Sequence, residues 1–251
     1  MNQSSLPQSL RLRWEIIIVL ALTFGSSALR ALLQLIAALR DTAPLNTQKV
    51  ILTQQLSDAW WLELGLQVAS AATLFAYGAL AIYLLSNDGI RLAPYRCKDI
   101  YLGIGFAALI GIPGLALYLY ALHTGWTREI LPSTSGNPLT GFPTLLLWSA
   151  ANAFGEELIV VMWLMTRLRT LGWSVPASIA ASSVLRGAYH LYQGISAGFG
   201  NIAMGIIFCI YFHKTQRIWP LIIAHFIINA IAFLGAPLLG MLSETHFTPL
   251  S

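Results

Sequence analysis

Long runs of apolar side chains are the feature that most restricts how this chain can fold. Of its 251 residues, 57% are hydrophobic and only 10% are charged, whereas soluble domains carry about 25% charged residues. The apolar runs repeat at the length of about 20 residues that a helix needs to cross a bilayer. Because backbone groups in lipid must be hydrogen-bonded inside the protein, the sequence predicts an all-α, polytopic transmembrane helix bundle.

Seven or eight spans are expected within one integral membrane domain of residues 1–251. The predicted spans cover residues 14–39, 60–85, 100–122, 142–168, 175–192, 201–212 and a seventh that begins at 219. The first is expected to be an uncleaved span rather than a signal peptide, because it stays apolar up to Leu39. The tail up to Leu242 is predicted to be an eighth span or a surface helix.

Basic residues are distributed unequally between the two ends of these spans. Nine fall on the side of the N-terminus: Arg11, Arg13, Arg91, Arg96, Lys98, Arg167, Arg169, Lys214 and Arg217. Three fall on the other side: Arg40, Lys49 and Arg128. Because Lys and Arg in short loops favour the cytoplasm, the N-terminus is predicted to be cytoplasmic. Short loops favour a bacterial plasma (inner) membrane, and no basic tract indicates nucleic acid as a partner.

Two adjacent carboxylates, Glu156 and Glu157, lie in the middle of the fourth predicted span. One charged side chain at the centre of a bilayer costs about 2.5–3.5 kcal/mol on insertion scales, so this pair is the best candidate for a functional centre. The spans hold further polar residues that need partners: Arg30, Asn152, Arg186, His190, Asn201, His225 and Asn229. Glu15 and Glu63 are expected at span ends, within reach of water.

Residue spacing indicates which of these groups share a helix face. Asn152 and Glu156 are four residues apart, as are Arg186 and His190, and His225 and Asn229. Adjacent helical residues point about 100° apart, so only one of Glu156 and Glu157 can face a given site. The other is expected to be neutralised by Arg186.

One Glu, two His and one Asn from three helices form a set suited to activating a water molecule. A carboxylate can act as general base, and imidazole or amide groups can donate to a developing oxyanion. Glu156, His190 and His225 also match a ligand set of catalytic zinc, although no His-Glu-x-x-His motif occurs.

Three ordered motifs carry a resemblance to a known family. They are Glu156-Glu157, the segment from Arg186 to His190, and His225-Phe-Ile-Ile-Asn229. The chain resembles the CPBP (Abi) family of intramembrane proteases, relatives of the type II CAAX prenyl endopeptidases, over a core of residues 142–233. The family's motifs are Glu-Glu-x-x-x-Arg, Phe-x-x-x-His and His-x-x-x-Asn/Asp.

The resemblance implies an endopeptidase that acts on a peptide or membrane protein in the bilayer, with or without a prenyl group. Glu156 would activate the water and Glu157 would support the site. His190 would position the water, or bind a divalent metal such as zinc together with His225 and Glu156. His225 and Asn229 would stabilise the tetrahedral oxyanion. Arg186 and Asn152 would support these catalytic residues from neighbouring positions. Metal-dependent and metal-free mechanisms both remain open.

Two positions depart from the family pattern. Val161 stands where the first motif has Arg, and Arg186 stands where the second has Phe. We hypothesise that the cation has moved to the facing helix and still compensates Glu157. The departures also leave room for a non-catalytic binding or immunity protein. A proton-coupled transporter is a further alternative, which an inverted repeat would favour; no such repeat is seen in the sequence.

Helix rise provides a further test of a shared site. At ~1.5 Å per residue, Glu156 lies about 16 Å from the inner end of its span, His225 about 12 Å and His190 about 24 Å. Straight helices would leave His190 at a different depth, so its helix is expected to tilt or to start later. If the functional interpretation is right, Glu156, His190, His225 and Asn229 line one cavity.

Overall fold

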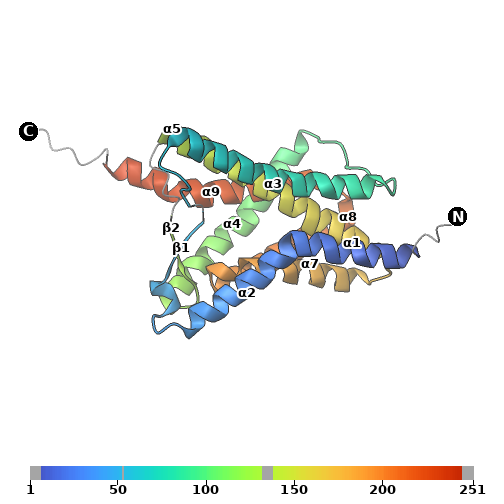
Figure 1. Cartoon of the computed structure of the whole chain (residues 1–251), viewed down its shortest axis with the longest axis horizontal. Helices are drawn as coiled ribbons and strands as arrows, with labels where there is room; N and C mark the ends of the chain where they lie inside the picture. The colour runs from blue at the N-terminus through green and yellow to red at the C-terminus, as the bar shows by residue number, and fades with distance from the viewer. Residues whose placement is uncertain (1–6, 53, 132–137, 245–251) are drawn as a thin grey trace, which may run out of the picture.

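The computed structural model describes residues 7–52, 54–131 and 138–244 and is helical apart from two short strands (Figure 1). The α-helices are α1 Gln8–Leu22, α2 Phe24–Arg40, α3 Trp60–Ser86, α4 Lys98–Thr124, α5 Pro138–Glu156, α6 Leu164–Thr170, α7 Val175–His190, α8 Ile195–Thr215 and α9 Trp219–Glu244. A π-helix, η2 Glu157–Trp163, joins α5 to α6. The short elements are η1 Leu45–Thr47, β1 Lys49–Ile51, β2 Glu129–Leu131 and η3 Leu191–Gln193.

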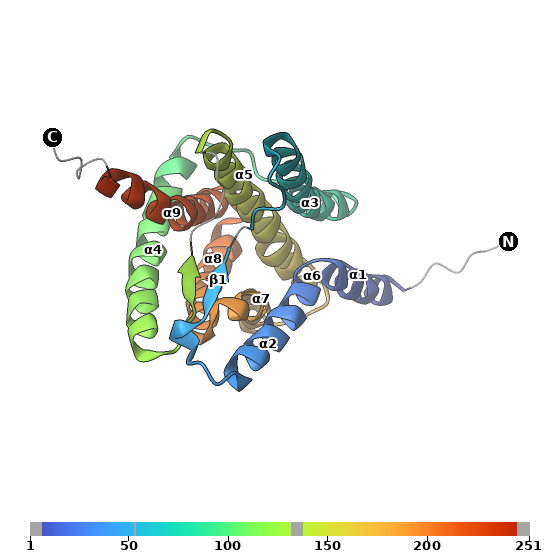
Figure 2. The ribbon, with the colours of Figure 1, turned by 60° about the vertical axis from the view of Figure 1, so that its left-hand side comes forward.

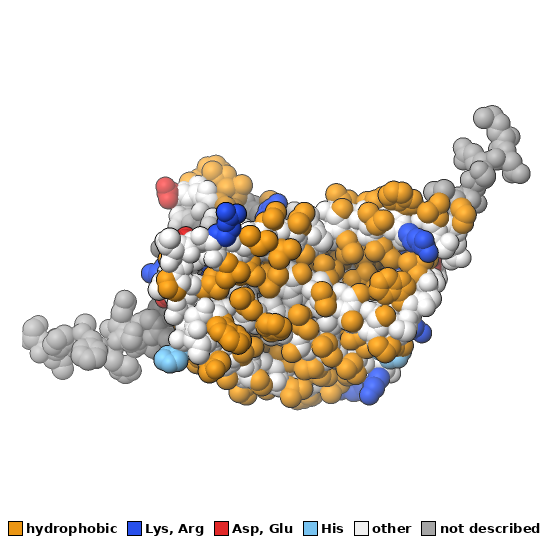
Figure 3. All heavy atoms as spheres, turned by 90° about the horizontal axis from the view of Figure 1, so that it is seen from below, with side chains coloured by type: hydrophobic (Ala, Val, Ile, Leu, Met, Phe, Trp, Pro, Cys, Tyr) orange, Lys and Arg blue, Asp and Glu red, His pale blue; other side chains and the backbone are white. Residues whose placement is uncertain are grey.

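The predicted class of all-α polytopic membrane protein is confirmed. Within the described residues, α3, α4, α8 and the continuous segment 141–170 are long and apolar enough to cross a membrane, and the bent pair α1–α2 makes a fifth if it is counted as one span. In Figure 3, apolar side chains cover the middle of the face shown, as a surface in contact with lipid requires.

Four or five clearly apolar span candidates are found within the described residues, and the count of seven or eight spans stays a prediction. Helix α7 has only 16 residues, and it is polar where Arg186 and several serines are buried against other helices. Helix α9 has 26 residues, Trp219–Glu244. The separate eighth segment is wrong, because α9 continues as one helix to Glu244.

Ionic contacts gather the loops next to the N-terminus at one end of the bundle, which we call the N-terminal face. There Arg167 pairs with Glu15 through Nε at 2.6 Å and with Asp88 through Nη1 at 2.5 Å. Arg217 likewise pairs with Asp99 at 2.6 Å. These contacts join segments that the basic residues had assigned to one side of the membrane.

The opposite end, which we call the strand face, carries β1 and β2 as a parallel pair with Lys49 opposite Glu129 (Figure 1). Arg128 donates from Nη2 to the carbonyl of Lys49 and from Nη1 to the carbonyl of Tyr192. The strand pair therefore connects the loops before α3 and α5 with the end of α7.

Glu15 and Glu63 are not at wetted helix ends, contrary to expectation. Glu15 is 14% exposed and accepts hydrogen bonds from Trp163 and Arg167. Glu63 is 8% exposed and accepts from two backbone amides of the preceding loop and from Gln67. Each carboxylate ties its helix to a neighbouring segment, because a buried carboxylate must be paired or hydrogen-bonded.

The segment from α5 through η2 to α6 forms the centre of the bundle. Helix α5 lies between α3 and α9 (Figure 2), while α7 packs against α2 and α8. Residues 158–165 are at most 5% exposed. At Gly155 a Cβ would come within 2.7 Å of the Leu74 carbonyl oxygen, so glycine lets α5 and α3 approach closely at the residue before the carboxylate pair.

Candidate functional site

The carboxylate pair lies where the α-helix changes to a π-helix. Glu156 is the last residue of α5 and Glu157 the first of η2. The carbonyl of Val160 within η2 accepts a hydrogen bond from Ser182 Oγ on α7 at 2.6 Å. Hydrophobic periodicity predicted an uninterrupted α-helix here. Short π-helical segments occur often at functional sites.

Glu157 is fully buried and joins two other helices. Its Oε1 accepts a hydrogen bond from Arg186 Nη2 of α7 at 2.7 Å, and His225 Nδ1 of α9 lies 2.7 Å from the same oxygen. Arg186 is also fully buried and lies over the ring of Phe208, 5.6 Å from its centroid. The ion pair that the sequence predicted between Glu157 and Arg186 is therefore present, and it compensates both buried charges.

Glu156 has a different environment. Its Oε2 accepts a hydrogen bond from the Tyr189 hydroxyl at 2.6 Å, and Arg186 Nη1 lies 3.8 Å away. The residue is 6% exposed and lines a cavity of about 420 Å³. The residues that line this cavity are Phe24, Ser27, Ser70, Thr73, Leu74, Tyr77, Trp148, Asn152, Glu156, Tyr189, His190 and Tyr192. One carboxylate thus faces a hollow with hydroxyl and amide groups, while its neighbour is held in the core.

Two of the predicted partners of Glu156 share its cavity. His190 lies at the end of α7, and its Nδ1 is 2.9 Å from the carbonyl of Arg186. Asn152 donates to the carbonyl of Trp148, one turn earlier on α5. Although α7 begins at Val175 as predicted, its course brings His190 to the same cavity as Glu156.

His225 and Asn229 do not line this cavity, so the expectation of one cavity for all four groups is wrong for this pair. His225 is 3% exposed and contacts Glu157, whose side chain is directed to α9 rather than to the hollow. Asn229 follows one turn later on α9, and its side chain makes no hydrogen bond within the described part of the chain. Only tertiary packing decides which of two adjacent carboxylates meets α9.

Tyr189 is the residue of the site that sequence reasoning missed. It lies between Arg186 and His190 in the sequence, and its buried hydroxyl binds Glu156. Its ring packs against Phe24 with a centroid distance of 5.0 Å, and Phe24 in turn meets Tyr77 edge-on at 6.1 Å. A tyrosine directly before a predicted site histidine, near the end of a predicted span, was a usable signal.

The donors considered for a metal are not gathered as a ligand set. Within the described residues, no group of three or more His, Cys, Asp or Glu side chains is placed to hold a metal ion. His225 Nδ1 lies against the other carboxylate, Glu157, and His190 Nδ1 against a backbone carbonyl. The arrangement of these side chains does not fit a metal site built from Glu156, His190 and His225.

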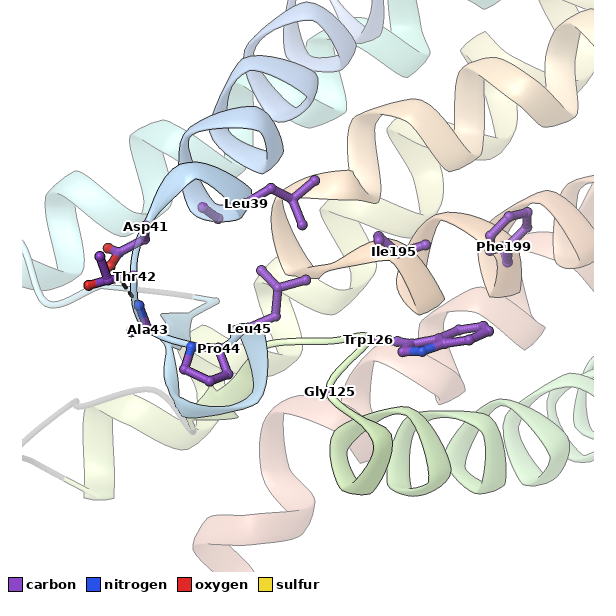
Figure 4. Close-up of a pocket in the computed structure, with 11 residues that line it drawn as sticks. Leu39, Asp41, Thr42, Ala43, Pro44, Leu45, Gly125, Trp126, Ile195 and Phe199 are labelled. Carbon is purple, nitrogen blue, oxygen red and sulfur yellow. Dashed lines mark hydrogen bonds between the residues drawn. The ribbon is translucent and has the colours of Figure 1, made fainter.

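A larger cavity of about 540 Å³ lies at the strand face, away from these residues. Figure 4 shows it between the end of α2, the start of α8 and Trp126. Its walls are mainly apolar, and none of the predicted site residues reaches it.

The fold and this centre define an integral membrane protein with a buried polar site on its central helices. Residues 138–231 match the model of the type II CAAX prenyl endopeptidase Rce1-like family. The matched segment contains all three motifs, so the match supports the resemblance that they carry. No curated protein and no solved structure matches the chain.

Proposed function

We propose that this protein is an intramembrane endopeptidase that hydrolyses a peptide bond with a water activated by Glu156. One observation carries the proposal: two adjacent carboxylates are held in opposite environments. Glu157 is fully buried in the core, where Arg186 and His225 both contact its Oε1, whereas Glu156 borders a cavity with hydroxyl and amide groups in its wall. A general base must be within reach of the water whose proton it takes, and Glu156 meets this requirement better than Glu157.

Glu156 would remove a proton from a water in the cavity while the water oxygen attacks the peptide carbonyl carbon. The same proton would then pass to the leaving amine nitrogen as the C–N bond breaks. Tyr189 donates to Oε2, which leaves Oε1 for the water. The Nδ1 atom of His190 faces a carbonyl acceptor, so Nδ1 carries the proton and Nε2 is the acceptor that would help to position the water.

The resemblance assigns oxyanion stabilisation to His225 and Asn229, and this role is part of the proposal. The geometry gives more support to a positioning role for His225, which holds Glu157 from α9. If its Nδ1–H is donated to the Glu157 carboxylate, Nε2 can donate to an oxyanion only when the ring is an imidazolium. Asn229 has the least geometric support of the proposed residues.

We further propose a bacterial plasma membrane location with the N-terminus in the cytoplasm, on the basis of the basic residues of the N-terminal face. The substrate would be a peptide or membrane protein, and a prenyl group on it is a hypothesis drawn from the family. A non-catalytic binding or immunity protein is the second candidate. It is favoured by the contacts of Glu157 with Arg186 and His225, because they give these three polar groups a structural role in the core.

The test is cleavage of a library of prenylated and unprenylated peptides by the purified protein in lipid nanodiscs. Glu156→Gln is expected to abolish cleavage. Glu63→Gln is the matched control, because Glu63 is a carboxylate of similar burial, 8% against 6%, that does not line the cavity. A chelator arm with zinc restoration tests metal dependence. Cleavage by Glu156→Gln at the wild-type rate would remove Glu156 from the mechanism, and no cleavage by folded wild-type protein would favour the binding protein.

A further inference from the structure

The cavity of about 540 Å³ at the strand face lies outside the proposed catalytic centre. It is placed between the end of α2 and the start of α8, two helices that both pack against α7 and η3. Figure 4 shows Asp41 and Thr42 at one end of this cavity. The rest of the wall is mainly apolar and includes Leu39, Leu45, Trp126, Ile195 and Phe199. The cavity is therefore amphipathic, with one polar end and a long apolar wall.

Hydrogen bonds between segments that are distant in the sequence hold these walls in place. The side-chain amide of Gln48 donates to the carbonyl of Ala38 on α2. Asn46 of η1 donates to a carbonyl near the end of α4, and the backbone N–H of Ile195 donates to the carbonyl of Trp126. Because the walls are already fixed, a ligand would lose little free energy in ordering them.

The apolar wall continues the surface that faces lipid. On α2, the exposed residues Leu32 and Leu39 are seven apart and so share a helix face. Phe199 and Ile206 on α8 have the same spacing and are also exposed. Trp126, which follows the end of α4, is 54% exposed, and tryptophan is enriched where lipid headgroups meet water. The cavity thus lies at headgroup depth, with its wall leading into the hydrocarbon region.

The charge at the polar end favours a cation. Of the described residues that line the cavity, Asp41 is the only charged one. Its Oδ1 accepts a hydrogen bond from the backbone N–H of Ala43 at 3.0 Å, so Oδ2 can accept from a ligand. Asp41 also directly follows α2, and the end of a helix carries a partial negative charge. Arg40, the last residue of α2, is exposed beside it and offers a cation to a phosphate.

We propose that this cavity binds one phospholipid whose headgroup carries a primary ammonium. The ammonium would donate to Asp41, and an acyl chain would lie along the apolar wall between α2 and α8. A lipid fits this cavity because one molecule supplies both the cation and the long apolar part, at the depth where the bilayer holds such molecules. This inference is independent of the proposed peptidase activity.

Native mass spectrometry of the purified protein in detergent tests the proposal. The protein is titrated with phosphatidylethanolamine and with phosphatidylglycerol of the same acyl chains. We expect one site that prefers phosphatidylethanolamine by about three- to fivefold, as one exposed ion pair allows. Asp41→Asn should remove this preference while still accepting the hydrogen bond from Ala43 that shapes the loop. Asp58→Asn is the matched control, because Asp58 is an exposed aspartate of the loop before α3 that does not line the cavity.

A second pair of variants tests the apolar wall. Phe199→Ala should weaken the binding of both lipids, whereas Phe142→Ala should weaken neither, because Phe142 is exposed on α5 and does not line the cavity. Equal binding of the two lipids by the wild-type protein would indicate ordinary annular lipid and overturn the proposal. An unchanged preference in Asp41→Asn, or unchanged affinities in Phe199→Ala, would also overturn it. So would a lipid-free dimer that Phe199→Ala dissociates, because a second copy of the chain would then cover this face.

Discussion

The buried pair of Arg186 and Glu157 supports a quantitative prediction of stability. Both side chains are fully buried, and Nη2 lies 2.7 Å from Oε1. Replacing Arg186 by Met would leave a carboxylate in the core with only His225 beside it. Removing one partner of a buried ion pair costs about 3–5 kcal/mol, whereas replacing both partners by apolar residues is often neutral or stabilising. We therefore expect Arg186→Met to lower the free energy of unfolding by about 3–5 kcal/mol.

A double-mutant cycle in detergent, followed by denaturant unfolding, measures this coupling. The double variant Arg186→Met with Glu157→Leu is expected to recover most of the loss of Arg186→Met. Arg169→Met serves as the control. Arg169 is an exposed arginine near the end of α6, in the same helical segment as Glu157, and its loss should cost less than about 1 kcal/mol. The reasoning fails if Arg186→Met is as mild as the control, or if the double variant is no more stable than Arg186→Met.

The same pair bears on the two departures from the family motifs. Arg186→Phe combined with Val161→Arg would return both positions to the family pattern. If the cation has moved between facing helices, the combination should restore the stability and activity that Arg186→Phe loses. Peptide cleavage and thermal unfolding of the three variants decide the matter, and a double variant as inactive as Arg186→Phe would refute the exchange.

Two further predictions concern the packing around the site, and a third concerns an ion pair of the N-terminal face. Ser182→Ala should lower the free energy of unfolding by about 1–3 kcal/mol, since it leaves the Val160 carbonyl of the π-helix without this partner. Ser178→Ala should cost less, because that hydroxyl bonds to the Ser174 carbonyl at the start of its own helix. Equal losses for the two variants in unfolding titrations would argue against this role of Ser182. Gly155→Ala should cost about 1–3 kcal/mol through overpacking against α3, and unchanged thermal stability would show that the helices can separate. The hydrogen bond from Arg167 lowers the pKa of Asp88, outweighing the opposing effect of burial. The stability that this interaction contributes is present above the ordinary aspartate pKa of about 4 and is lost as pH falls through the lowered value. In Asp88→Asn, the free energy of unfolding should therefore fall less steeply with decreasing pH than in the wild-type protein.

Much of the architecture could be read from the sequence because the bilayer allows few solutions. Apolar runs of membrane length have to form helices, and α3 and α4 are found within two residues of the predicted bounds, whereas α8 begins at Ile195, six residues before the predicted start at 201. The basic residues sorted the loops into two groups, and the contacts of Arg167 and Arg128 show the same grouping. That one of the two adjacent carboxylates would pair with Arg186 also followed from charge, because a buried carboxylate needs a partner.

Other features depend on contacts between residues that are far apart in the sequence. The π-helix after Glu156 is not visible in hydrophobic periodicity, because residues 158–165 are apolar on every side. Glu15 was expected in water, yet it is largely covered and accepts hydrogen bonds from Trp163 and Arg167, about 150 residues later in the chain. The length of a helix can be read from its composition, but its bend, tilt and neighbours cannot.

The sequence by itself determined that two adjacent carboxylates would be buried among helices and that one of them would need Arg186. Only the tertiary structure decided that Glu157 meets Arg186 and His225 while Glu156 borders a cavity with Tyr189 and His190. The physical reason is that neighbouring residues on a helix point in different directions. Which direction meets a cation and which meets a hollow depends on how the surrounding helices pack.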